Sequence, residues 1–244
     1  MIFKFLEKPI TITAFTSVDY SFANTYAPVV PALRFYPKWM KNLPSEKFNL
    51  EEFRWNQNVK SCAGIIGTFQ SGFIIPLWSD LAISTTENSW KYHYSDERSS
   101  LSIHKNEQAT GFFEDHYIFK LHSPWMLKTS RDLKILVCQP FYSTNEKLSY
   151  FTPYAINQTT NKILSTNIFI FCKKEKNSFM IKHNTPILHL IPLTEKKVKI
   201  KTEILNDLEF QKINSVQNTI IQFNRSGFQK IKILNENKKD RENR

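Results

Sequence analysis

The sequence predicts a mainly β protein, an antiparallel sandwich or barrel of the jelly-roll type with a few short helices and a C-terminal helix. About ten short runs either alternate apolar and polar residues or are apolar throughout, as strands of half-buried and buried sheets do. The connections between them are about 4–10 residues long, which favours antiparallel neighbours. The 244 residues are 41% hydrophobic and include 20 Phe, 9 Tyr and 5 Trp, enough to bury one sizeable core.

About eight to ten strands are expected, and most can be placed on the chain. The runs that predict them are Ile10–Thr16, Phe73–Thr85, Ser89–Ser95, Tyr117–Leu121, Leu133–Gln139, Thr166–Cys172, Phe179–Lys182, Ile187–Leu193 and Lys196–Ile204. Pro76 interrupts the second run, so that strand should lie at an edge or carry a bulge. In the last run Val198 and Ile200 share one face and lysines occupy the other, which indicates a solvated face or a guarded edge.

Two short helical segments are predicted in the first third of the chain. Tyr36–Asn42 has the composition of a single turn that begins near a proline. Val59–Gln70 carries an apolar face at helical spacing. Asn58 is suited to cap its N-terminus, and Gly72 is suited to its C-terminal cap.

The strongest helical pattern lies near the C-terminus, over Asp207–Asn224. Apolar residues recur there every three or four positions, Asn206 or Asp207 can cap the start, and Gly227 can end the helix. We therefore predict three regions. Residues 1–204 form the β domain, residues 205–234 a helix and short strand that pack on it, and residues 235–244, which contain no apolar side chain, a disordered basic tail.

The net charge of +11 does not by itself indicate a nucleic-acid reader. Lysine far outnumbers arginine, and arginine supplies the bidentate contacts that specific readers need. Lysine together with many Ile and Asn residues is also typical of an AT-rich coding genome. Residues 196–244 hold 12 basic and 6 acidic residues, so any nucleic-acid contact should be weak, nonspecific and made through this lysine-rich region.

The cysteines and the hydropathy pattern indicate in which cellular compartment the protein is expected. Cys62, Cys138 and Cys172 are far apart without a CxxC spacing, so we expect free, buried thiols in a reducing compartment and no zinc site. The N-terminus lacks the apolar stretch of a secretion signal. No run reaches the ~18 apolar residues of a membrane helix. The protein is therefore expected not to be secreted and to have no transmembrane segment.

The sequence contains no GxSxG, GxGxxG, Walker loop or HExxH motif. His104, Glu107 and His189 partly match the spacing of the ligands in a cupin metal site. The HxH pair of cupins is missing, as are the glycines that frame their metal motifs. No metal and no cofactor are therefore predicted.

The best candidate for a ligand site combines two segments, Ser71–Asp80 and Lys120–Thr129, each with a Trp, a Pro and polar groups. Strand parity would place Trp78 and Asp80 on one face. The candidate ligand-binding residues are Trp78, Asp80, His104, Gln108, Trp125 and Lys128. The indoles would form an apolar wall, Asp80 and Lys128 would orient the ligand, and the imidazole and amide would add hydrogen bonds. The alternative is that both Trp residues belong to the core and that the polar groups cap loops.

Four strings resemble a family of uncharacterised proteins from tailed phages of marine bacteria. They are PALRFYPKWMKNLP, VKSCAGIIGTFQSGFIIPLWSD, SPWMLKT and IKHNTPILHLIPL. The similarity runs from about Val30 to Ile200 and omits the first 29 residues and the C-terminal helix. It implies a phage origin, in keeping with the composition. The family has no assigned activity, so the resemblance transfers no catalytic residue.

Three functions are compatible with these observations. The first is a non-catalytic β protein that binds a partner or takes part in particle assembly. The second is a phage-encoded enzyme acting on a small molecule in the Trp78, Asp80, His104 and Trp125 region. The third is a nonspecific nucleic-acid-binding protein. The first is favoured, with viral or host proteins as partners, an oligomer allowed, and the host cytoplasm or the virion as location.

Overall fold

The computed structural model describes residues 8–44, 47–56, 58–104, 114–141, 149–150, 153–160 and 163–213. The chain divides into two compact units, Met1–Ile204 and Leu205–Arg244. In the second unit, residues 207–213 are helical. The side chain of Asn206 caps that helix by accepting a hydrogen bond from the Glu209 amide at 3.0 Å. The predicted short strand Phe228–Leu234 and the predicted tail lie outside the described residues.

The prediction of a mainly β, antiparallel fold is confirmed. The strands are β1 (Ile10–Ser17), β2 (Val30–Pro31), β3 (Lys47–Asn49), β4 (Arg54–Asn56), β5 (Phe73–Pro76), β6 (Leu81–Thr85), β7 (Trp90–Tyr94), β8 (Leu101–His104), β9 (His116–Thr129), β10 (Leu133–Cys138), β11 (Ser149–Tyr150), β12 (Tyr154–Gln158), β13 (Leu164–Lys173), β14 (Asn177–Ile181), β15 (Pro186–Pro192) and β16 (Val198–Leu205). The short helices are η2 (Val18–Tyr20), α1 (Ser21–Tyr26), η3 (Ala32–Phe35), α2 (Lys38–Lys41) and α3 (Ala63–Gln70).

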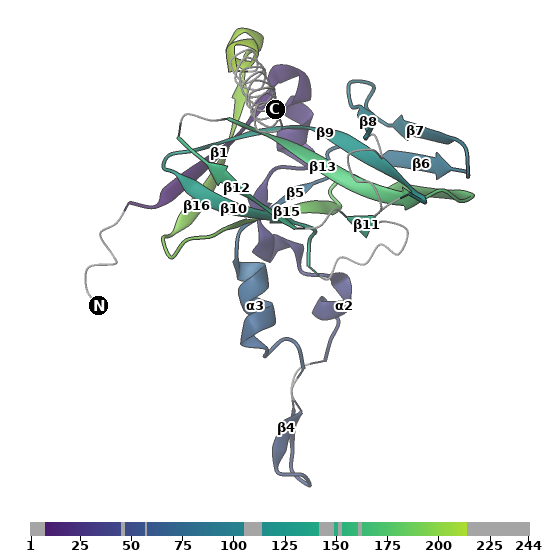
Figure 1. Cartoon of the computed structure of the whole chain (residues 1–244). Helices are drawn as coiled ribbons and strands as arrows, with labels where there is room; N and C mark the ends of the chain where they lie inside the picture. Colours follow the sequence, from purple (N-terminus) through teal and green to yellow (C-terminus); the bar gives the residue numbers. More distant parts are fainter. Residues whose placement is uncertain are drawn as a thin grey trace, which may run out of the picture. The chain divides into compact units, whose positions relative to one another are not determined.

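Two large sheets form the sandwich (Figure 1). The six-stranded sheet has the order β11-β13-β9-β1-β16, and β8 also pairs with β9. The five-stranded sheet has the order β12-β10-β15-β5-β2, and a three-stranded sheet β14-β6-β7 accompanies them. β3 and β4 form a separate hairpin.

The core lies between the inner faces of these sheets. Ile12 and Phe119 come from the six-stranded sheet, Ile75 and Leu190 from the five-stranded sheet, and Ile83 from the three-stranded sheet; all five are fully buried in one cluster. Successive strand residues point to opposite faces, so each strand contributes alternate residues to this cluster. Burial of so many large side chains is the main stabilising contribution to the fold, about 1.5–3 kcal/mol for each.

The predicted single strand Phe73–Thr85 is wrong. It divides into β5 and β6, which belong to different sheets. Pro76 ends β5, and the chain then crosses between the sheets, where the Leu77 amide donates to the Thr185 carbonyl and the Leu77 carbonyl accepts from the Asn184 amide. The argument from strand parity therefore does not apply to Trp78 and Asp80, because neither lies in a strand.

β9 is longer than predicted. The strand expected at Tyr117–Leu121 and the polar segment expected after it form one strand of 14 residues. Pro124 does not end the strand. The register between β9 and β13 shifts between Ser165 and Asn167, and an irregularity of this kind accommodates a proline, which lacks the N–H of the ladder.

The helix predicted at Val59–Gln70 begins later, at Ala63, with Cys62 as its N-terminal boundary. The Asn58 side chain caps a preceding turn instead, accepting from the Lys60 amide at 2.8 Å. Cys62 is exposed, contrary to the expectation of burial, whereas Cys138 and Cys172 are buried; all three are free. The helix position explains the difference, because residue 62 lies at the end of the helix and not on its apolar face.

The alternation predicted for the last strand is confirmed for Val198 and Ile200, which pack against the core, while Lys199 and Lys201 are exposed. Along the part of the chain that the structure describes, no helix combines the length and the apolar character that a membrane crossing needs.

Candidate functional site

Two of the six predicted site residues share a cavity. Trp78 and Asp80 line a depression of about 290 Å³ between the β5–β6 connection and α1. Trp78 is 2% exposed, and its indole N–H donates to the Ser99 hydroxyl at 2.9 Å. Ser99 in turn donates to an oxygen of Asp96 at 2.8 Å. This chain of bonds fixes the wall of the depression.

Asp80 connects two turns. One carboxylate oxygen accepts from the His183 amide at 2.7 Å and lies 2.9 Å from its Nδ1. The other oxygen accepts from the Lys182 ammonium at 3.0 Å. These bonds, the one from the His183 amide first, hold the pKa of the Asp80 carboxyl well below its usual range. Because these donors all come from the β14–β15 turn, the Asp80 carboxylate has a structural role: it holds this turn against the β5–β6 connection.

The three other described candidates, Trp125, Lys128 and His104, are not in the lining of this depression. Trp125 is fully buried in the core, and its indole N–H has no partner among the residues that the structure describes. Lys128, three positions further along β9, is exposed on the opposite face. His104 lies on β8, with its ring 5.2 Å from that of Phe169. Gln108 lies outside the described residues.

Replacement of Asp80 by Ala should lower the free energy of unfolding by about 1 kcal/mol at neutral pH, because three donors lose a charged acceptor on a partly exposed site. The folded-state pKa of Asp80 is depressed. Its contribution is therefore present above the pKa of an unfolded Asp, and the difference between wild type and variant should shrink as the pH falls below about 4. Urea unfolding across pH, with exposed Glu195→Ala as the control, measures this. A difference that stays constant down to pH ~2 would contradict it.

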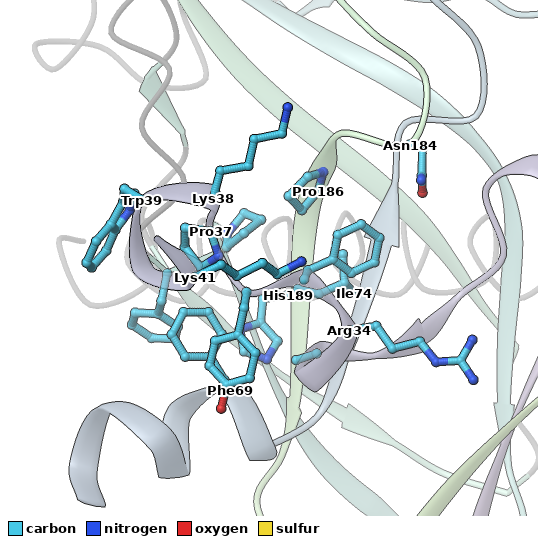
Figure 2. A pocket seen from close by; sticks show the side chains of 15 residues that line it. Arg34, Pro37, Lys38, Trp39, Lys41, Phe69, Ile74, Asn184, Pro186 and His189 are labelled. Atoms are coloured by element: carbon cyan, nitrogen blue, oxygen red, sulfur yellow. The ribbon is translucent and has the colours of Figure 1, made fainter. Parts of the chain in front are cut away.

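A larger cavity, of about 540 Å³, lies over the outer face of the five-stranded sheet. Its lining consists of Ala32, Arg34, Phe35, Tyr36, Pro37, Lys38, Trp39, Lys41, Phe69, Ile74, Pro140, Phe141, Asn184, Pro186 and His189. Figure 2 shows these side chains around the opening. We call it the η3–α2 cavity.

The floor of the η3–α2 cavity follows from strand alternation. Phe73, Ile75, Leu188 and Leu190 point into the core, so Ile74 of β5 and its register partner His189 of β15 point to the outer face. There they form the base of a second, thinner layer.

The segment η3–α2 supplies the walls over that floor. It is attached to the sheet by a hydrogen bond from the Ala32 amide to the Gly72 carbonyl at 3.1 Å. It is attached to α3 by the rings of Tyr36 and Phe69, whose centroids are 4.6 Å apart. Lys60 donates to the Lys41 and Leu43 carbonyls at 3.2 and 2.6 Å and so fixes the end of α2.

His189 is the buried polar group of the cavity. It is 1% exposed. Its Nε2–H donates to the Ser71 carbonyl at 2.7 Å, and its ring meets Phe141 edge to face at 5.6 Å. Burial lowers the pKa of the imidazole, although the bond to Ser71 acts in the opposite direction. Neutral His189 therefore keeps a lone pair on Nδ1, which is buried and has no partner in the described part of the chain.

The charge around the cavity has one sign. Among the lining residues that the structure describes, Arg34, Lys38 and Lys41 are cations and none is a carboxylate. In Figure 2 the Lys41 side chain extends across the opening, whereas those of Arg34 and Lys38 extend outward at its edge. Trp39 is 41% exposed. Aromatic walls with several cations suit an anion that has a flat apolar body.

Sequence reasoning missed this site. Eight of its described lining residues lie in the string PALRFYPKWMKNLP, whose local pattern predicts only a helical turn. The signal that could have indicated it is the interleaving of three cations with Phe35, Tyr36 and Trp39 between prolines. His189 carried no such signal, because only the sheet register shows that it faces this segment.

No protein-family model matches the chain, and no curated protein matches it either. Function is therefore inferred from the geometry of the cavity.

Proposed function

We propose that the protein is a non-catalytic binding protein whose ligand is an anion with an aromatic or other flat apolar body, held in the η3–α2 cavity. The observation that carries this proposal is the described lining of the cavity of about 540 Å³, in which three cations and five Phe, Tyr or Trp rings occur without a carboxylate. That volume lies within the range of about 300–1,000 Å³ typical of small-ligand sites.

The aromatic walls would supply most of the binding energy. Phe35, Tyr36, Trp39, Phe69 and Phe141 all border the cavity, and a flat ligand stacked among them would remove apolar surface from water. Lys41 would pair with the anionic group from above. The free lone pair of His189 Nδ1 would accept a hydrogen bond from a ligand N–H or O–H, which relieves the cost of a buried acceptor without a partner.

The residues at the cavity favour binding over catalysis. Its described lining contains no Ser, Thr or Cys and no Asp or Glu, so it offers no pairing of such a nucleophile with a base. Cys138 pairs with His189 across the strands, but its thiol donates to a backbone carbonyl, and burial raises its pKa to about 11. It is a structural thiol at neutral pH.

The resemblance to phage proteins extends over part of the η3–α2 cavity. One of the resembling strings, PALRFYPKWMKNLP, supplies the wall of the η3–α2 cavity. We therefore extend the proposal to a phage protein that acts in the host cytoplasm or in the particle, with recognition as its task.

Anilinonaphthalene sulfonate is a suitable probe, because it is aromatic and anionic and its fluorescence reports binding. Phenylnaphthylamine has the same rings without the sulfonate. Lys41→Gln should weaken binding of the sulfonate about 5- to 10-fold, by removing a charge-assisted contact. The same variant should leave binding of the neutral amine within about twofold, since the apolar surface is kept.

Lys128→Gln is the matched control, because Lys128 is an exposed lysine that does not line the cavity. It should leave both probes unchanged. Equal weakening by the two lysine variants, or an equal loss of both probes in Lys41→Gln, would show that the cavity does not select for an anion.

A further inference from the structure

The hairpin formed by β3 and β4 carries an exposed apolar surface. Among the described strands these two pair only with each other, in the register Phe48 opposite Trp55. The turn between them is fixed by Asn49, whose side chain accepts from the Glu51 and Glu52 amides at 3.0 and 3.3 Å. In Figure 1 the hairpin extends beyond α2 and α3. We call residues 47–56 the aromatic hairpin.

Its side chains form a cluster that faces solvent. Phe48 lies edge-on to Phe53 and to Trp55, with centroid distances of 5.5 and 5.6 Å. Leu50 is 80% exposed, Phe53 83% and Trp55 58%. Phe53 also has a φ of 51°, a left-handed conformation that a bulky side chain rarely adopts. Exposed groups of this kind mark interaction surfaces in soluble proteins.

The tip of the hairpin is acidic. Glu51 and Glu52 lie between Leu50 and Phe53. Arg54 neutralises Glu52 through an ion pair of 2.5 Å, and Glu51 remains exposed. The tip thus combines aromatic rings with a carboxylate, which is the chemistry that the η3–α2 cavity is suited to bind.

We propose that the aromatic hairpin of one copy of this chain docks in the η3–α2 cavity of a second copy. Phe53 would enter between the aromatic walls, and Glu51 would pair with Lys41 or Lys38. No residue of the hairpin belongs to the lining of the cavity in its own chain, so the cavity is open to another copy. The inference rests on the proposed function and names its partner.

A lipid surface is the other apolar environment that the hairpin could enter. Cytoplasmic membrane faces are anionic and attract lysine and arginine next to the inserted side chains. Here Glu51 and Glu52 lie between the exposed Leu50 and Phe53, and Arg54, on the other side of Phe53, is paired with Glu52. The remaining charge of Glu51 opposes insertion at such a surface and favours a cationic cavity.

Self-association of the full chain tests the proposal directly. Sedimentation velocity over a concentration series should show a closed dimer, if two copies exchange hairpins, or a growing chain, if each copy donates to the next. Phe53→Ser and Lys41→Glu should each raise the dissociation constant at least about 30-fold, as loss of a central aromatic or charged contact does. Met180→Ser is the control, because it removes another exposed apolar side chain, 53% exposed, from β14.

Mixing the two variants gives a sharper test. Phe53→Ser keeps an intact cavity, and Lys41→Glu keeps an intact hairpin. Neither should associate alone, but an equimolar mixture should form mixed dimers through one remaining contact. Mixed dimers support the proposal. Failure of the mixture to associate, at a concentration where wild type does, overturns it.

The probe of the proposed function separates the two claims. An excess of anilinonaphthalene sulfonate should dissociate wild-type assemblies, and the Phe53→Ser variant should bind that probe at least as tightly as wild type. If wild type stays monomeric while probe binding still depends on Lys41, hairpin docking is overturned and the binding function stands. If wild type associates through Phe53 but the probe neither binds in the cavity nor competes, the proposed ligand class fails instead. Binding of a monomeric protein to phosphatidylcholine vesicles that requires Phe53 also overturns docking.

Discussion

Alanine in place of Gly72 is expected to lower the free energy of unfolding by at least about 3 kcal/mol. Gly72 connects α3 to β5 and has a φ of +77°, which a side chain adopts only with strain. A Cβ at this position would also lie 2.0 Å from the carbonyl oxygen of Leu190. That oxygen belongs to the backbone of β15, so it cannot rotate away as a flexible side chain would.

Gly64→Ala provides the matched control. Gly64 lies in α3, and a Cβ there would meet nothing within 4 Å. The substitution should be neutral or stabilise the protein by up to about 1 kcal/mol, because glycine is a poor helix former. Urea unfolding followed by tryptophan fluorescence compares the two variants. Similar midpoints for both would show that the close approach of Gly72 to β15 is absent in solution.

The same variant should affect the η3–α2 cavity. The Gly72 carbonyl accepts the hydrogen bond that attaches η3, and the neighbouring Ser71 carbonyl accepts the bond from His189. A shift of this connection moves a wall and the buried imidazole together. Folded Gly72→Ala protein should therefore also bind anilinonaphthalene sulfonate more weakly than wild type.

The second large effect is expected at Trp78. Trp78→Phe should cost about 2–4 kcal/mol and Trp125→Phe about 1–2 kcal/mol, although each removes the same atoms from a buried site. Trp78 donates to Ser99 at 2.9 Å, so its loss leaves a hydroxyl lone pair without a donor next to the cavity that the smaller ring creates. Trp125 has a buried indole N–H that finds no partner among the residues described, and phenylalanine removes that unfavourable group.

Denaturant unfolding of the two variants, followed by circular dichroism because each change removes a fluorophore, measures the difference. Adding Ser99→Ala to Trp78→Phe should recover about 1 kcal/mol relative to the sum of the two single changes, because both partners of the bond are then absent. If Trp125→Phe proves the more destabilising of the two, the hydrogen bond to Ser99 does not govern the stability of this region.

The candidate site shows where prediction from the sequence stopped. Trp78 and Asp80 do line one depression. Strand parity does not place them there, because Pro76 ends β5 and the chain then crosses to another sheet. Trp125 and Lys128 could not share a site in any register, since an odd separation along β9 places them on opposite faces. The sequence alone is enough to separate these two residues, once β9 is recognised as one strand.

Local pattern alone determined the β class, most of the strands and the division of Val198 and Ile200 from the neighbouring lysines. These features depend on alternation and turn chemistry within a few residues, which the chain carries in its own order. The η3–α2 cavity was decided by the tertiary structure. Its floor pairs Ile74 with His189, 115 positions apart in the sequence and adjacent only through the register of β5 and β15. Which strands pair is settled by burial of all faces at once, and no local segment contains that information.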